Sequence, residues 1–195
     1  MSEKPPPADR DEGGSESAEA VRSILVRAVA AIATRLGEIE RPGIATEDLC
    51  RDLTTALSRA SWPGPGFRVR RDRIRGETGR GGAWRFDVLI ERSDGVVAAI
   101  DVRGSERDPK LRAETLSRLS LARARGIAET AFLFGVNRSD ASPDGSPTVE
   151  TAVPGVVPTS CLAIAEIEGP VLSGWVLTLW EVPASVPPSP RHAGA

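Results

Sequence analysis

The chain has 195 residues and carries 25 basic against 27 acidic side chains, so its net charge of −2 identifies no partner. Two cysteines and a single histidine, His192 in a proline-rich tail, exclude the common zinc sites and any mechanism that needs a positioned histidine base. No apolar run reaches the roughly 20 residues of a membrane span, and the polar N-terminus is unlike a signal peptide. We therefore expect no membrane contact and a cytoplasmic location.

The first part of the chain predicts a tail and two helices. Residues 1–16 are polar, acidic and proline-rich, which is typical of a disordered tail. A first helix is expected from Ser17, as its N-cap, to about Leu36, because apolar residues recur there on one face. A second amphipathic helix begins at Thr46 and ends before the Trp-Pro-Gly-Pro-Gly break at 62–66.

The second part predicts a mixed sheet. Strand patterns occur at 67–74, 84–91, 96–103, 127–137, 160–168 and 174–182. The helix at 108–125 is long enough for a crossover between parallel strands, and its basic side chains are interpreted as a solvated face. The order of elements predicts one α/β or α+β domain at 17–183, with a mixed central sheet flanked by helices. Composition predicts a flexible loop at 138–158 and a proline-rich tail at 184–195.

The pairing of the second and third strands decides the functional interpretation. A two-residue Asp94-Gly95 turn would place charged side chains on the apolar face. A three-residue loop from Ser93 to Gly95 avoids this cost and gives Gly95 the left-handed conformation that such loops favour. Three apolar pairs then share one face: Phe86 with Val102, Val88 with Ile100, and Ile90 with Ala98. We predict this second register.

The same register places Asp87 directly opposite Asp101, with Cβ atoms about 4.5–5.5 Å apart. Two like charges so placed need a cation near them. A divalent ion, Mg²⁺ or Mn²⁺, would meet that need with carboxylate ligands. A salt-bridged square would also meet it, because the register sets Arg85 opposite Arg103 beside the two acids. The residues alone leave both alternatives open.

Asp87 lies on one predicted strand and Asp101-Val102-Arg103 on the next, after a predicted helix and a strand. This arrangement resembles the PD-(D/E)XK nuclease superfamily. The resemblance spans roughly residues 44–137. It implies a restriction-endonuclease-like fold and Mg²⁺-dependent phosphodiester hydrolysis, with Asp87 and Asp101 as metal ligands and Glu47 as an assisting helical acid. The family has lysine where this chain has Arg103, which stays protonated and would stabilise charge on a phosphate.

The expected partner is nucleic acid, DNA in preference to RNA. A local positive field suited to a phosphate backbone comes from Arg70, Arg71, Arg73, Arg75 and Arg80. Charges along an edge strand also guard against aggregation, which is the simpler interpretation of the same residues. The alternative function is a catalytically inactive binding or assembly module in which the acids and arginines form a structural network. A homodimer or another protein partner stays open.

Overall fold

The computed structural model describes residues 12–40, 43–75, 84–104, 109–138 and 160–184, which form three helices and a six-stranded sheet. The helices are α1 (Glu12–Gly37), α2 (Thr46–Ser58) and α3 (Pro109–Ala124). The strands are β1 (Arg68–Arg75), β2 (Trp84–Arg92), β3 (Gly95–Arg103), β4 (Thr130–Arg138), β5 (Ser160–Ile167) and β6 (Trp175–Glu181). The predicted α+β class, with a mixed sheet flanked by helices, is confirmed.

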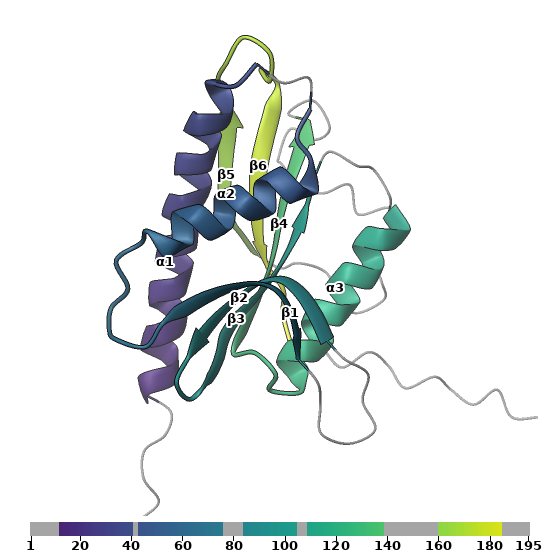
Figure 1. Ribbon diagram of the computed structural model, residues 1–195. Coiled ribbons are helices and arrows are strands. Elements are labelled where there is room, and N and C mark those ends of the chain that lie inside the picture. The colour runs from purple at the N-terminus through teal and green to yellow at the C-terminus, as the bar shows by residue number, and fades with distance from the viewer. Residues whose placement is uncertain (1–11, 41–42, 76–83, 105–108, 139–159, 185–195) are drawn as a thin grey trace, which may run out of the picture.

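The strands lie in the order β1-β2-β3-β4-β6-β5. β1, β2 and β3 form an antiparallel meander, and α3 carries the chain over to β4, which pairs with β3 in parallel. β6 and β5 complete the sheet as an antiparallel hairpin. In Figure 1, α1 and α2 cover one face of the sheet and α3 covers the other. β1 and β5 are therefore the edge strands of the described sheet.

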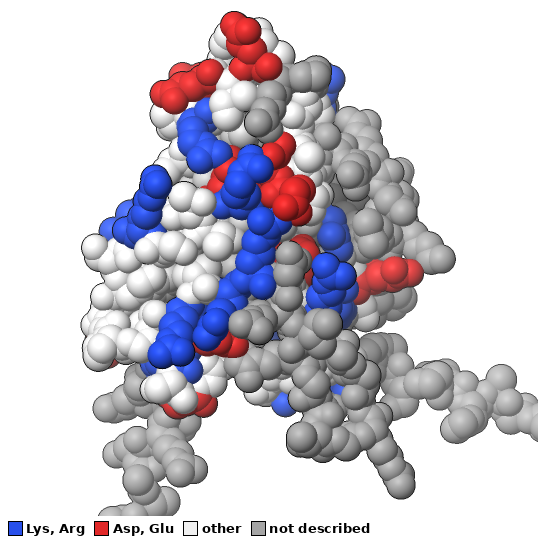
Figure 2. Space-filling model, viewed as in Figure 1, with Lys and Arg blue, Asp and Glu red and all other residues white. Residues whose placement is uncertain are grey.

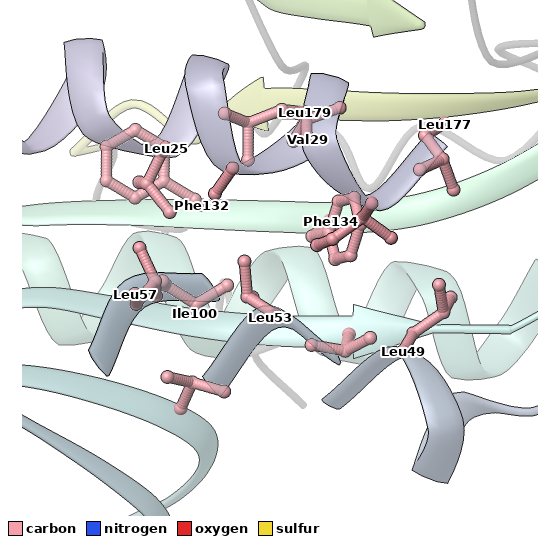
Figure 3. Close-up of a cluster of buried hydrophobic side chains, with 14 of the residues drawn as sticks. Leu25, Val29, Leu49, Leu53, Leu57, Ile100, Phe132, Phe134, Leu177 and Leu179 are labelled. Atoms are coloured by element: carbon pink, nitrogen blue, oxygen red, sulfur yellow. The ribbon is translucent and has the colours of Figure 1, made fainter. Parts of the chain in front are cut away.

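Apolar side chains fill the spaces on both faces of the sheet. The cluster under α1 and α2 includes Leu25, Val29, Leu49, Leu53, Leu57, Ile100, Phe132, Phe134, Leu177 and Leu179 (Figure 3). The cluster under α3 includes Phe86, Leu89, Ala99, Leu116, Leu119, Ala131 and Leu133. Because helices cover both faces, the central strands are apolar on both sides. A charge in the middle of β3, such as Asp101, therefore needs a specific partner.

The register of β2 and β3 agrees with the prediction in the core but not at the turn. Val88 pairs with Ile100 and Ile90 with Ala98, whereas Arg92 pairs with Gly95. The turn therefore has two residues, Ser93 and Asp94, and the extra residue of β3 lies in a bulge at Val97. The predicted three-residue loop was wrong, and Gly95 does not adopt a positive φ.

The bulge explains why the predicted core register is nevertheless right. One extra residue anywhere between the turn and Ala98 shifts the ladder by the same amount. At the bulge, Val96 belongs to the α3 cluster while Val97 and Ala98 both belong to the α1–α2 cluster. Consecutive apolar residues thus fill both faces without displacing a polar side chain. Phe86 also lies in the α3 cluster, although Val88 lies in the other, so the predicted pair of Phe86 with Val102 does not form.

The ends of the helices differ from the sequence-based boundaries. α1 begins at Glu12, inside the segment predicted as a tail, although Gly13 and Gly14 are poor helix formers. The predicted N-cap at Ser17 is therefore wrong. The loop at 138–158 and the C-terminal tail fall largely outside the described residues. Within the described part of the chain, no helix is long and apolar enough to cross a membrane.

Candidate functional site

Asp87 and Asp101 come together where β2 and β3 stop pairing. The ladder ends at Val88 and Ile100. Beyond that point Oδ2 of Asp87 accepts a hydrogen bond from the backbone N–H of Val102 at 2.8 Å. The carboxylate takes the place of a ladder carbonyl, so it satisfies a buried N–H at the position where the strands separate. Asp87 therefore has a structural role whatever else it does.

Asp101 is fully buried and points from β3 toward α3. Arg118 of α3 donates hydrogen bonds to its Oδ2 from Nε, at 3.2 Å, and from Nη2. The Oδ1 of Asp101 is buried and has no hydrogen-bond partner among the described residues. The basic side chains of α3 were interpreted as a solvated face, and for Arg118 that interpretation is wrong. Thr115 and Arg118 lie three residues apart, on neighbouring positions of the helix surface that faces β3.

Burial raises the pKa of Asp101 above its ordinary value, because a low-dielectric environment disfavours the carboxylate. Arg118 opposes this shift through its charge and its hydrogen bonds. The negative charge of Asp87 raises the pKa further, and the positive charge of Arg103 lowers it. The loss of hydration is the largest of these effects, so the pair with Arg118 offsets the cost of burying the charge only in part.

Arg103 ends β3 and connects three elements. Its Nη1 lies 4.0 Å from Oδ2 of Asp87 and donates to the carbonyl of Val102 at 3.1 Å. Its Nη2 donates to Oγ1 of Thr115 on α3. The contact between Asp87 and Arg103 is one diagonal of the predicted square. The other diagonal would join Arg85 to Asp101. The described partner of Asp101 is instead Arg118, and the backbone of Arg85 pairs with Ile74 of β1.

Glu47 lies apart from the two acids. It stands in the first turn of α2, its side chain is 73% exposed, and Arg71 of β1 donates a hydrogen bond to it. α2 covers one face of the sheet, whereas Asp101 faces α3 on the other. The structure therefore does not bring Glu47 to the partners of Asp101. What holds this end of α2 is Thr46, whose Oγ1 accepts a hydrogen bond from the N–H of Gly104 at 2.7 Å.

The acids as arranged do not fit a resident Mg²⁺. The ion needs several accessible oxygen ligands and retains water. Oδ2 of Asp101 is bound by Arg118, its other oxygen is buried, and Oδ2 of Asp87 is bonded to Val102. Among the described residues, no group of three or more His, Cys, Asp or Glu could hold a metal. Two guanidinium groups supply the positive charge that the acid pair requires.

Arg70 and Arg71, which are neighbours in β1, lie on opposite faces of the strand. Successive side chains of a strand point to opposite faces, so Arg71 reaches Glu47 on α2 while Arg70 lies 3.5 Å from Glu91 on β2. The side chains of Arg73 and Arg75 lie outside the part of the chain that the structure describes, and so does the whole of Arg80. Their predicted contacts with nucleic acid stay predictions.

α1 and α2 contribute further basic residues that were not among the predicted nucleic-acid contacts. Figure 2 shows a diagonal band of basic side chains over the face that α2 and β1 present, with acidic groups beside it. Five arginines line the two grooves on this face, and we refer to them as the arginine surface: Arg27, Arg35, Arg51, Arg59 and Arg71. The sequence shows the helical spacing of these arginines, but it does not show which side of each helix lies next to β1.

Several residues of the arginine surface are already engaged. Arg35 binds the buried Asp52, and Arg51 binds Asp48. Arg27 and Arg59 have no ion-pair partner among the residues that the structure describes. Comparison of this chain with family models, with curated proteins and with solved structures gives no match. Its function is therefore inferred from the geometry of the two acids and of the arginine surface.

Proposed function

We propose that this domain binds nucleic acid through the arginine surface, and that Asp87 and Asp101 stabilise the fold rather than hold a metal. The observation that carries the proposal is the gathering of five arginines from α1, α2 and β1 on one face of a chain whose net charge is −2. A local positive field of this kind attracts a phosphate backbone even when the whole protein is slightly acidic.

Arginine is suited to this role by its geometry. Its planar guanidinium presents several N–H donors that match phosphate oxygens in pairs, and it stays charged at every physiological pH. Each phosphate that is neutralised releases condensed counterions, so the affinity falls steeply with salt. Arg27 and Arg59, with no carboxylate partner in the described part of the chain, are the groups most available for such contacts.

The pair formed by Asp101 and Arg118 favours the non-catalytic alternative over hydrolysis. A metal ion at Asp101 would have to displace a guanidinium that already offsets part of the cost of burial. The order β1-β2-β3-α3-β4, with the two acids on neighbouring strands, supports a relationship to the PD-(D/E)XK nucleases. On this proposal the chain keeps their arrangement of elements and uses the acid positions for internal ion pairs.

The proposal can be tested by fluorescence anisotropy with labelled single-stranded DNA, double-stranded DNA and RNA, over a series of salt concentrations. We expect binding in the presence of EDTA, an affinity that falls as salt rises, and intact substrate after incubation with Mg²⁺ or Mn²⁺. If the protein bound none of the three nucleic acids at low salt, the proposal would be wrong.

Cleavage is the second readout of the same experiment. Cleavage that requires Mg²⁺ or Mn²⁺ and disappears in Asp87→Asn would establish the hydrolytic alternative instead. Glu114→Gln is the matched control for that variant, because Glu114 is an exposed acid on α3 and its substitution changes the net charge equally. A contaminating nuclease would cleave in both variants.

A further inference from the structure

α2 and β1 enclose a basic groove that the contacts of the acid pair do not involve. Its volume is about 270 Å³, and it is lined by Arg51, Thr54, Thr55, Ser58, Arg59 and Arg71. The lining contains three guanidinium groups, three hydroxyl groups and no carboxylate. Cations that converge from a helix and a neighbouring strand repel one another unless an anion lies between or beside them.

The spacing along α2 explains the convergence. Residues 51, 54, 55, 58 and 59 lie three or four positions apart, so they share one side of the helix. That side faces β1, whose Arg71 enters the groove from the strand. Asp48 neutralises part of the charge of Arg51, and Glu47 does the same for Arg71. Arg59 has no such partner among the described residues.

Helix polarity explains only part of this arrangement. A cation at Arg59, the C-cap of α2, is favoured by the carbonyl groups that end the helix. This effect does not reach Arg51, which lies in the middle of the helix, or Arg71, which belongs to a strand. The hydroxyl groups of Thr54 and Thr55 donate to backbone carbonyls of their own helix. The hydroxyl of Ser58 has no hydrogen-bond partner among the described residues and remains available beside Arg59.

We infer that this groove is a phosphate-binding site, formed by Arg51, Arg59, Arg71 and Ser58, that takes a phosphodiester of a nucleic-acid strand. The inference rests on the proposed function, which it makes specific. A phosphate would supply negative charge to Arg59, which has no carboxylate partner among the described residues, and would accept hydrogen bonds from the three guanidinium groups and from the Ser58 hydroxyl.

The neighbouring groove favours a strand over free phosphate. It lies between α1 and α2, has a volume of about 420 Å³, and shares Thr55 and Arg59 with the basic groove. Its apolar lining comes from Ile24, Ala28, Ala31, Ile32, Ala56 and Ala60. A phosphate held by Arg59 would therefore lie next to an apolar recess that is suited to a sugar or a base.

The test uses two variants of the groove, the single variant Arg59→Gln and a double variant that also carries Arg51→Gln. The control is Arg125→Gln. Arg125 follows α3 on the opposite face of the sheet, so its loss removes one charge without touching the groove. With a short fluorescein-labelled DNA single strand, Arg59→Gln is expected to weaken binding about tenfold, and Arg125→Gln less than about twofold. Thermal melting of every variant controls for loss of fold, and Arg59→Lys keeps the charge at the helix end if Arg59→Gln unfolds.

Titration with inorganic phosphate, with chloride as the control, separates the site from the proposed function. We expect shifts in the amide NMR signals of residues 58 and 59 with phosphate but not with chloride. Strand binding that is equal in the wild type and in the double variant would overturn the site and leave the proposed function intact. Phosphate-induced shifts without any strand binding would support a phosphate site and overturn the proposed function. No response to either probe would overturn both.

Discussion

Arg118 of α3 binds the carboxylate of Asp101 in β3 with two nitrogens of its guanidinium, and Asp101 has no exposed surface. The pair joins the sheet to the helix that carries the chain from β3 to β4. Arg103 makes a second connection between the same two elements through Thr115. The end of β3 is therefore attached to α3 by polar contacts, next to a cluster that is otherwise apolar.

Removal of Arg118 should reveal the cost of a buried charge. We expect Arg118→Met to lower the free energy of unfolding by about 2–4 kcal/mol at neutral pH, because a buried carboxylate is left without its cation. The lower end of this range reflects the 37% exposure of the Arg118 side chain. Urea denaturation measures the change.

A double-mutant cycle separates charge from packing in that result. In the presence of Asp101→Asn, the same Arg118→Met substitution should cost less than about 1 kcal/mol, because no buried charge remains. If Arg118→Met lowered the free energy of unfolding equally in the wild type and in Asp101→Asn, Arg118 would act through the packing of its side chain and not through its charge.

The pH dependence of stability should show the raised pKa of Asp101. Because its folded pKa lies above the unfolded value of about 3.9, the protonated group favours folding most below that unfolded pKa. This contribution is lost as the pH rises through the folded pKa. The stability of Asp101→Asn relative to wild type is therefore expected to increase with pH across that interval and then to level off. A difference that is constant across a series of urea melts at different pH values would contradict the raised pKa.

Glu181 of β6 should have the opposite dependence. Hydrogen bonds from Arg22 on α1, at 2.8 and 2.9 Å, lower the pKa of Glu181, and Arg123 on α3 approaches it to 3.1 Å. A lowered folded pKa gives stability above the unfolded pKa, of about 4.3, that is lost as the pH falls through the folded value. Glu181→Gln should cost about 2 kcal/mol at neutral pH and progressively less toward strong acid, as measured by chemical denaturation. A cost that persists unchanged at low pH would point to packing alone.

The sequence predicted the order of the elements and the core register because both follow from apolar patterns. Val88 and Ile100 face each other in either arrangement of the extra residue, so the pattern could not distinguish a longer turn from a bulge at Val97. The bulge places Val96 in the α3 cluster and Val97 in the α1–α2 cluster, whereas the longer turn would exchange their faces. Because both residues are valines, the apolar pattern is the same in the two arrangements. Local chemistry favours the observed turn, because Arg92 binds Asp94 across it.

The partners of the acids could not be predicted from the same patterns. Arg118 contacts Asp101 because α3 packs on β3 with one particular rotation, and that rotation depends on tertiary contacts such as those of Leu116 and Leu119. The arginine surface poses the same difficulty. Arg59 and Arg71 meet only because the chain after α2 returns along its side to begin β1, and the spacing within either element contains no sign of this.

The junction between α2 and β3 allows a prediction about backbone approach. A Cβ added to Gly104 would lie 2.7 Å from the nitrogen of Thr46 and 2.8 Å from the carbonyl oxygen of Ile44, both backbone atoms. Gly104→Ala should therefore destabilise the fold by about 1–3 kcal/mol in thermal or urea melts. Gly43→Ala is the matched control, since nothing lies within 4 Å of its added Cβ. Equal stability of the two variants would show that α2 can shift away from Gly104 at little cost.

Glu47 separates the binding proposal from the hydrolytic alternative. It is exposed and paired with Arg71, so Glu47→Gln should change the free energy of unfolding by less than about 0.5 kcal/mol. The same change removes the negative charge of Glu47 from the edge of the basic groove, next to Arg71. Nucleic-acid affinity should then rise about two- to fivefold, and its dependence on salt should steepen by up to about one counterion.

The comparison for Glu47→Gln is again Glu114→Gln, which adds the same net charge on the opposite face of the sheet. A gain in affinity for Glu47→Gln but not for Glu114→Gln, measured by anisotropy at several salt concentrations, would assign the effect to the groove rather than to overall charge. If Glu47 were instead the assisting acid of a metal-dependent nuclease, its substitution would abolish cleavage and leave the affinity in EDTA unchanged. The two functions thus predict different responses to the removal of one carboxylate: the binding proposal predicts a higher affinity, and the hydrolytic alternative predicts lost cleavage at unchanged affinity.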